Sequence, residues 1–331
     1  MKERYKELDL MKGIAIILVF LFHSLQVGKY SFINLNDLTK IIFINAHYFM
    51  MPLFFIISGF LSNSGKEYSL KKYYINKLKR LLIPYLFINF IDFIPRTLFP
   101  NLVNSKFGGI REVLFYGTKI TWFVYTLFII FLIFPFVEKF IIKKDKYYLF
   151  GIFILFINYL GFAEKIELFA INTVVYYFIY FYLGYIIRPF YKKNIYNGIF
   201  TSNKFFVILS VVFLGLFYKF LLVNFFTKIL FVLMSILFYL NITKRIKDNS
   251  EIYNLFKFFG VNSLTFYLFD GFVAVICRTI ILKTISIERT ALCIVLLFIS
   301  KTLLMFIAIK FIVVKSSILS FLLGASVEKN N

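Results

Sequence analysis

The sequence predicts an all-α integral membrane protein, a polytopic bundle of about ten transmembrane helices with both termini in the cytoplasm. Composition is the first reason, because 61% of the 331 residues are hydrophobic and 22% are aromatic, whereas a soluble domain has about 45–50% apolar residues. The second is that the apolar residues form long runs without Asp, Glu, Lys or Arg, such as residues 13–28, 41–65, 120–137 and 168–187. Such runs match the roughly 17–25 residues that a helix needs to cross the hydrocarbon core. The alternation of apolar and polar residues that is typical of a membrane β-barrel does not occur.

Ten membrane spans are expected in chain order. They cover about residues 10–29, 44–62, 81–95, 120–137, 147–162, 169–187, 205–223, 227–243, 259–277 and 291–313. The third is the weakest, since it holds Pro84, Asp92 and Pro95. The longest connections, about 96–119 and 188–204, are too short for a soluble domain, so residues 1–331 are predicted to form one membrane domain.

The formal net charge of +22 is explained by membrane topology rather than by binding to nucleic acid. Lys and Arg cluster between the apolar runs, and with the N-terminus in the cytoplasm 25 of the 38 fall on the cytoplasmic side. This bias predicts a multi-pass protein of the cell membrane. No small-residue cleavage site follows the first apolar run, which is therefore predicted to be a retained helix rather than a signal peptide.

The chemistry of such a protein depends on the few ionisable residues inside its spans, because burying them in hydrocarbon is costly unless they serve a function. They are His23, His47, Asp92, Asp270 and Lys301. The two histidines are the only ones in the chain, so a general base near neutral pH is either a histidine or a carboxylate or lysine of strongly shifted pKa. No metal site is predicted, because the two cysteines do not form a CxxC pair.

Lys12 and His23 lie in the first span, separated by about three helical turns, and so share one face about 16 Å apart along the axis. This arrangement suits a long donor with an anionic end at Lys12 and a reactive end at His23, as in an acyl-coenzyme A. The alternative is that Lys12 anchors the helix at the interface and His23 forms a hydrogen bond between helices.

Two further features follow in the chain. Ser58 and Gly59 in the second span permit close helix approach or a kink, and this packing role is favoured over Ser58 as a nucleophile.

Lys77 and Arg80 lie in a strongly basic connection, where they help to set topology. Their spacing also predicts two cations on one helical face that are available to phosphate groups.

Asp270 and Lys301 are expected near the middle of the ninth and tenth spans. Opposite charges at similar depth predict an ion pair that lowers the cost of burying both. The pair is interpreted as a structural latch, with a proton relay as the alternative.

Several stretches of the chain together resemble the membrane acyltransferase-3 family, whose members O-acylate sugars of cell-surface glycans. They are Leu8-Asp9-x-x-Lys12-Gly13-x-Ala15-x-x-x-Val19-x-x-x-His23, Pro52–Leu61, Lys77-x-x-Arg80-Leu81-x-x-Pro84-Tyr85, Thr121-Trp122-Phe123-x-x-x-Leu127-Phe128, Phe181-x-Leu183-Gly184-Tyr185 and Gly260-x-Asn262-Ser263-Leu264-x-x-Tyr267-Leu268. The resemblance covers roughly residues 4–315 and is most specific near the N-terminus. It implies that His23 is the catalytic histidine and that Lys12 takes the place of the family's usual arginine.

The resemblance also implies that Lys77 and Arg80 face coenzyme A. The chain departs from the family at three points. Lys12 lacks the bidentate fork of arginine; Met50 stands where relatives of the fucose-acetylase type often have histidine, with His47 one turn earlier; and Asp270 stands where many members have histidine. The last two departures leave the polar partner of His23 open, with Asp9, His47, Ser58, Asp270 and Lys301 as possible supporting residues.

The resulting hypothesis is an O-acyltransferase that moves an acyl group, acetyl by family habit, from acyl-CoA to a hydroxyl of a cell-surface or lipid-linked carbohydrate. Acyl-CoA is expected as a co-substrate rather than as a permanently bound cofactor, and the partners are the glycan acceptor and the lipid bilayer, not nucleic acid. The competing hypothesis is a transporter or flippase for a lipid-linked glycan or exopolysaccharide, with His23, Asp270 and Lys301 as coupling residues. No repeat is evident between the two halves, which counts against a transporter.

Overall fold

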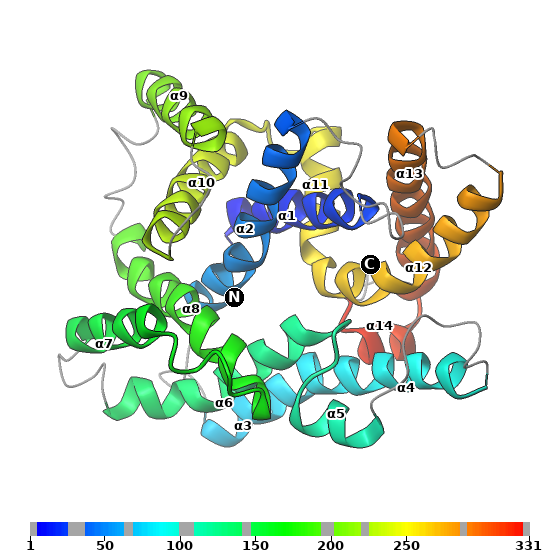
Figure 1. The fold of residues 1–331 in the computed structure, drawn as a ribbon, viewed down its shortest axis with the longest axis horizontal. Helices are drawn as coiled ribbons and strands as arrows, with labels where there is room; N and C mark the ends of the chain where they lie inside the picture. Colours follow the sequence, from blue (N-terminus) through cyan, green and yellow to red (C-terminus); the bar gives the residue numbers. More distant parts are fainter. Residues whose placement is uncertain are drawn as a thin grey trace. The chain divides into compact units, whose positions relative to one another are not determined.

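A computed structural model describes residues 5–25, 37–62, 69–98, 109–140, 147–192, 202–219, 225–284 and 290–326. The regular elements in these ranges are all helical, which confirms the predicted all-α class (Figure 1). The chain divides into two compact units. The first contains residues 1–57 and 186–312, and the second contains residues 58–185 and 313–331.

The first unit is built from helices at the two ends of the chain. They are α1 (Lys6–Ser24), most of α2 (Asp37–Phe60), α9 (Asn203–Lys219), α10 (Phe225–Arg245), α11 (Glu251–Val261), α12 (Ser263–Thr284) and α13 (Thr290–Ala308), which continues into a π-helical turn (Ile309–Val313).

The second unit comes mainly from the middle of the chain. It contains α3 (Leu70–Lys77), a π-helical turn (Leu78–Leu82), α4 (Ile83–Leu98), α5 (Gly109–Phe115), α6 (Trp122–Phe140), α7 (Tyr147–Leu160), a 3₁₀ turn (Leu168–Ala170), most of α8 (Ile171–Lys192) and α14 (Ser317–Leu323).

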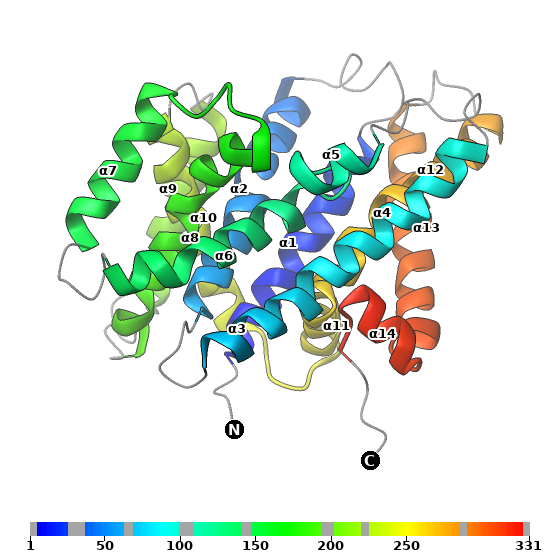
Figure 2. The same ribbon diagram turned by 90° about the horizontal axis from the view of Figure 1, so that it is seen from below.

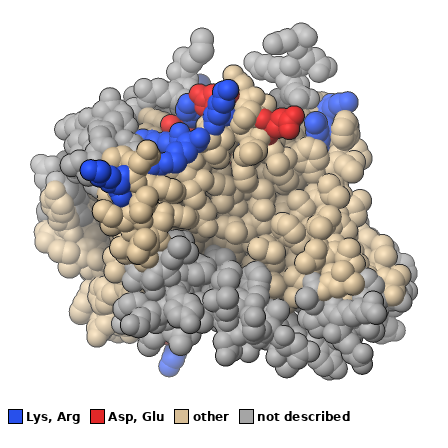
Figure 3. Space-filling view, turned by 90° about the horizontal axis from the view of Figure 1, so that it is seen from above, with Lys and Arg blue, Asp and Glu red and all other residues tan. Residues whose placement is uncertain are grey.

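Five helical segments in the described residues are long and apolar enough to cross a membrane. They are Trp122–Phe140, Leu168–Pro189, Phe225–Arg245, Ser263–Ile281 and Leu292–Val313. Shorter apolar helices cover Tyr48–Phe60, Tyr148–Leu160 and Asn203–Val212. Charged side chains gather along one edge of the face in Figure 3, beside a broad uncharged band. These features support a membrane protein, whereas the number of ten spans and the cytoplasmic location of both termini stay predictions.

In the first unit, α1 packs closely against α11, and the two helices lie next to each other in both Figure 1 and Figure 2. Two glycines permit this approach. A methyl group at Gly13 of α1 would overlap the carbonyl oxygen of Phe256, and one at Gly260 of α11 would overlap the carbonyl oxygen of Asp9. Any larger residue would force the two backbones apart, so these glycines set the position of α1 and of the polar residues that it carries.

In the second unit, the end of α2 approaches α8 in a similar way. A methyl group at Gly59 would overlap the carbonyl oxygen of Phe181, which agrees with the predicted packing role of the Ser58–Gly59 step. Beside this contact, the ring of Phe181 packs edge to face against the rings of Phe131 and Phe134 of α6.

Candidate functional site

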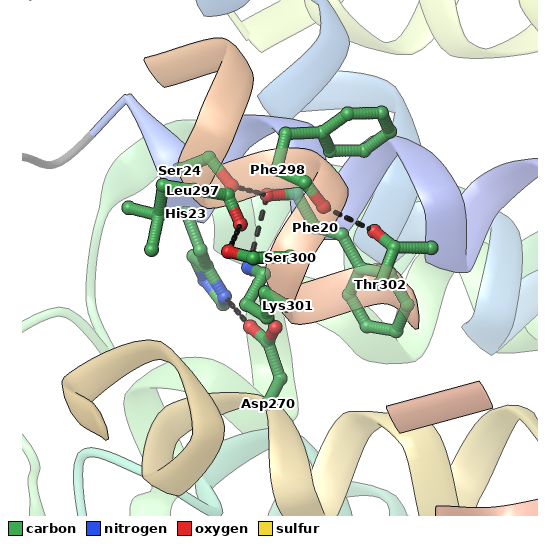
Figure 4. A network of polar contacts seen from close by, with 9 residues as sticks. All are labelled: Phe20, His23, Ser24, Asp270, Leu297, Phe298, Ser300, Lys301 and Thr302. Atoms are coloured by element: carbon green, nitrogen blue, oxygen red, sulfur yellow. Dashed lines mark hydrogen bonds and ion pairs between the residues drawn. The ribbon is translucent and has the colours of Figure 1, made fainter. Parts of the chain in front are cut away.

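The candidate site of the first unit centres on His23 in the last turn of α1. Nδ1 of His23 is hydrogen-bonded to Oδ2 of Asp270, which lies in α12 (Figure 4). The His23 side chain is 38% exposed, whereas that of Asp270 is 2% exposed. The carboxylate of Asp270 is therefore buried and holds the His23 ring, whereas the ring itself can be reached by a substrate.

Lys301 of α13 completes the network and is fully buried. Its Nζ lies 2.7 Å from Oδ1 of Asp270, so the predicted ion pair forms. The same Nζ donates a hydrogen bond of 3.0 Å to the carbonyl oxygen of Phe20 in α1. Three helices are thus joined at one point, and each oxygen of the buried carboxylate faces a basic group.

The Phe20 carbonyl is held from two sides, which fixes the turn of α1 that precedes His23. Besides Lys301, the Ser24 hydroxyl donates a hydrogen bond of 2.7 Å to this oxygen. The Phe20 ring packs against Phe266 with its centroid 5.8 Å away, and Lys301 Nζ lies 5.2 Å from the centre of the Phe20 ring. Polar and aromatic contacts together hold the backbone that carries His23.

The His23–Asp270 arrangement determines which imidazole nitrogen can act on a substrate. An ionised carboxylate only accepts hydrogen bonds, so Nδ1 of His23 carries the hydrogen that Asp270 accepts. Nε2 then keeps its lone pair and can take a proton. The negative charge of Asp270 stabilises the imidazolium that results, which is the role of the carboxylate in a His–Asp pair. Chemically, the site is suited to general-base catalysis.

Lys12 lies at the other end of α1, where its Nζ forms an ion pair of 2.7 Å with Oδ1 of Asp9. The two side chains are 15% and 13% exposed. Lys12 is therefore neutralised by its own helix, which weakens the case for a direct contact with phosphate. Its predicted role in donor binding stays a prediction.

The remaining predicted site residues lie in the second unit or outside the described side chains. Lys77 Nζ lies 3.3 Å from the centre of the Phe131 ring, whereas Arg80 is exposed in the π-helical turn after α3. Ser58 lies near the end of α2 and is half-buried. His47 lies in α2, but its side chain is outside the described part of the structure. The expectation that Lys77 and Arg80 share one ligand with Lys12 stays a prediction.

Sequence reasoning proposed Asp270 as a partner of Lys301 and left the partner of His23 open. The structure brings all three residues together, although 247 positions separate His23 from Asp270. The one sequence signal was that Asp270 stands where the family resemblance implies histidine in many members, and a carboxylate is the usual partner of a general-base histidine. Nothing in the sequence brings the two side chains together.

The first unit also contains an open cavity of about 740 Å³ near the start of α1. It is lined by Lys6, Glu7, Asn203, Thr243, Lys244, Arg245, Ile246, Lys247 and Asp248. Lys6 forms an ion pair of 2.6 Å with Asp248, and Arg245 donates hydrogen bonds to Asn241 and Asn203 while lying over the Phe206 ring. The cavity therefore presents four cations against two carboxylates, and sequence reasoning did not identify it.

Comparison with known families gives a match over nearly the whole chain. Residues 5–315 match the acyltransferase-3 family, described as an acyltransferase domain. The matched range includes His23, Asp270 and Lys301 and extends over nearly the whole chain. No curated protein and no solved structure matches the sequence.

Proposed function

The chain belongs to the acyltransferase-3 family of membrane acyltransferases, and from that premise we propose that it transfers an acyl group from acyl-CoA to a hydroxyl of a cell-surface or lipid-linked carbohydrate. Acetyl is the acyl group that we favour. The observation that carries the proposal is the His23–Asp270 pair, in which an accessible imidazole is held through Nδ1 by a buried carboxylate. Transfer to a hydroxyl needs such a base, because an alcohol is a weak nucleophile until its proton is removed.

In the proposed reaction, Nε2 of His23 takes the proton of the acceptor hydroxyl as its oxygen attacks the thioester carbonyl. The C–O bond forms, the C–S bond breaks, and the departing thiolate takes the proton from the imidazolium. Asp270 stabilises the transient imidazolium, and Lys301 holds the carboxylate in place through its ion pair. A variant of the scheme has His23 carry the acyl group before passing it to the alcohol.

The phosphates of the donor would bind at the cavity near the start of α1. Its lining comes from three segments, around Lys6, Asn203 and Lys244–Asp248, and the charge bias predicts that each lies on the cytoplasmic side. The axial distance along α1 from Lys6 to His23 is about 25 Å, which is comparable with the length of an extended acyl-CoA. Cations at one end and a base at the other suit a donor that enters from the cytoplasm.

The experiment is a thiol-release assay with purified protein in detergent, acetyl-CoA and a glycan extract from the host. We expect glycan-dependent release of free coenzyme A, with a loss of about 10²–10⁴-fold in His23→Ala, the range for a general base. His47→Ala is the matched control, since it removes the other histidine of the chain. Equal activity in His23→Ala and wild type would remove His23 from the mechanism.

A transporter for a lipid-linked glycan is the second candidate, because a buried ion pair such as Asp270–Lys301 within predicted spans is also typical of coupling sites. The two functions differ in what they require. A transferase consumes acetyl-CoA in detergent, whereas a transporter moves its cargo only across a sealed bilayer and releases no thiol.

A further inference from the structure

The second unit contains an open cavity of about 510 Å³ that the predicted active site does not use. It is formed where α5 ends, α6 begins and α8 begins. The lining residues are Glu112, Tyr116, Gly117, Thr118, Lys119, Trp122, Glu167, Ala170, Asn172 and Thr173.

The lining combines aromatic rings with neutral and acidic hydrogen-bonding groups. Trp122 and Tyr116 supply apolar ring faces, and Trp122 is the only tryptophan of the chain. Asn172, Thr173 and the two carboxylates supply donors and acceptors at several positions. A sugar ring has the matching chemistry, because its C–H face packs on an aromatic ring while its hydroxyls bond to carboxylates and amides.

The charges of the lining favour an uncharged ligand over a phosphate. The cavity has one cation, Lys119, against the carboxylates of Glu112 and Glu167. Among the described residues, neither carboxylate is paired with a cation. Both are therefore available to the hydroxyls of a ligand, and both would repel an anion.

The wall that follows α5 is held rigidly. The Tyr85 hydroxyl donates to the Val113 carbonyl at 2.6 Å, and the Tyr125 hydroxyl donates to the Leu114 carbonyl at 2.8 Å. The Thr118 hydroxyl donates to Asn89 Oδ1 at 2.7 Å. A site whose walls are fixed before binding spends less free energy on ordering them when the ligand arrives.

The opposite wall contains backbone strain. Phe169 and Ala170 both have positive φ angles, 53° and 50°, although neither is glycine. Hydrogen bonds keep this turn in place: the backbone N–H of Asn172 donates to the Ile166 carbonyl at 3.0 Å, and the hydroxyls of Thr173 and Thr126 are 2.8 Å apart. Strained residues of this kind concentrate at ligand sites, where the surrounding structure maintains them.

We propose that this cavity binds a sugar ring of the carbohydrate acceptor, with Trp122 as the stacking surface and Glu112, Glu167 and Asn172 as hydrogen-bonding groups. The inference rests on the proposed function for the identity of the acceptor. It also implies that the acceptor binds on the outer side of the membrane, since the charge bias predicts that all three segments of the lining lie there.

The single tryptophan makes a direct test possible, because tryptophan emission, excited where the 23 tyrosines hardly absorb, comes from one side chain that lines the cavity. Glucose, galactose, fucose and N-acetylglucosamine, free and as short oligosaccharides, would be titrated into wild-type protein in detergent. We expect a saturable change in emission with at least one of them. In Glu112→Gln/Glu167→Gln the same sugar should bind about tenfold more weakly, the usual effect of losing hydrogen bonds to charged groups.

Glu164→Gln is the matched control, since it removes a carboxylate from the same connection as Glu167 but outside the lining, and its titration should equal wild type. The proposal is overturned if no sugar gives a saturable change, or if the double variant binds as tightly as wild type. The two proposals fail separately. Sugar binding without thiol release contradicts the transferase function, whereas thiol release with an unchanged acceptor KM in the double variant contradicts this cavity alone.

Discussion

The two ends of α1 each carry a basic residue that is paired with an aspartate, and the two pairs differ in almost every other respect. Lys12 pairs with Asp9 three positions earlier in the same helix, and both side chains keep some contact with solvent. His23 pairs with Asp270 of another helix, and that carboxylate is fixed in turn by the buried Lys301. The first pair is a local contact that any helix could form, whereas the second requires three helices to meet.

The two pairs should therefore differ in how much stability the protein loses when one partner is removed. Lys12 and Asp9 are still 15% and 13% exposed, so water and neighbouring side chains can partly solvate either charge when its partner is removed. Removing one partner of a buried pair costs about 3–5 kcal/mol, because the other charge is left in a medium that solvates it poorly. The end of α1 for which we propose a catalytic role is therefore also the end at which substitutions should destabilise the protein most.

The largest expected effect on stability is that of Lys301→Met. It leaves Asp270 buried without its cation and should lower the free energy of unfolding by about 3–5 kcal/mol. Thermal unfolding in detergent measures this loss. Lys12→Met is the matched variant at the other end of α1, and the comparison fails if the two variants are equally stable.

Combining Lys301→Met with Asp270→Asn separates stability from catalysis. The double variant has no unpaired buried charge and should recover much of the lost stability, since replacing a whole buried pair is often close to neutral. It should not recover activity, because the amide cannot stabilise an imidazolium. Recovery of wild-type activity would show that Asp270 and Lys301 have a structural role only.

Gly260→Ala tests whether the close approach of α1 and α11 positions both pairs. The added methyl group would overlap the Asp9 carbonyl oxygen, and we expect a loss of about 1–3 kcal/mol from overpacking. Gly151→Ala in α7 is the control, because its methyl group would meet the Tyr182 ring at an ordinary 3.4 Å. Equal unfolding temperatures for the two variants would show that the crossing tolerates a side chain.

Lys247 is one of the four cations that line the cavity near the start of α1. Lys247→Ala should raise the KM for acetyl-CoA by about tenfold and leave kcat unchanged, since it removes a charged contact to the phosphates that we propose bind there. Lys310→Ala, which removes an exposed cation outside the cavity, should have a wild-type KM. A wild-type KM in Lys247→Ala would place donor binding elsewhere.

The smallest effect should be that of Lys12→Ala, whose cation is already paired with Asp9. We expect a change of less than about fivefold in the KM for acetyl-CoA, which corresponds to less than about 1 kcal/mol. Steady-state kinetics over a range of acetyl-CoA concentrations measures it. A larger increase than in Lys247→Ala would return Lys12 to the role that the family resemblance implies.

Much of the fold was predictable from the sequence, because long apolar runs and helix spacing are local properties of the chain. The Asp270–Lys301 pair was also predictable, since opposite charges in consecutive predicted spans have few other partners. The His23–Asp270 contact was not, because it depends on how distant helices pack, and that packing is set by glycines such as Gly13 and Gly260. The cavity beside Trp122 was missed for the same reason, since three separate segments form it.

The central claim is that Asp270 makes His23 a base, and kcat for Asp270→Asn tests it most directly. Acetyl-CoA and acceptor would be held at saturation, and folding of the variant would be checked by its unfolding transition. We predict that kcat falls by about 10²–10⁴-fold while the KM for acetyl-CoA is unchanged. A folded Asp270→Asn protein with wild-type kcat would contradict the account.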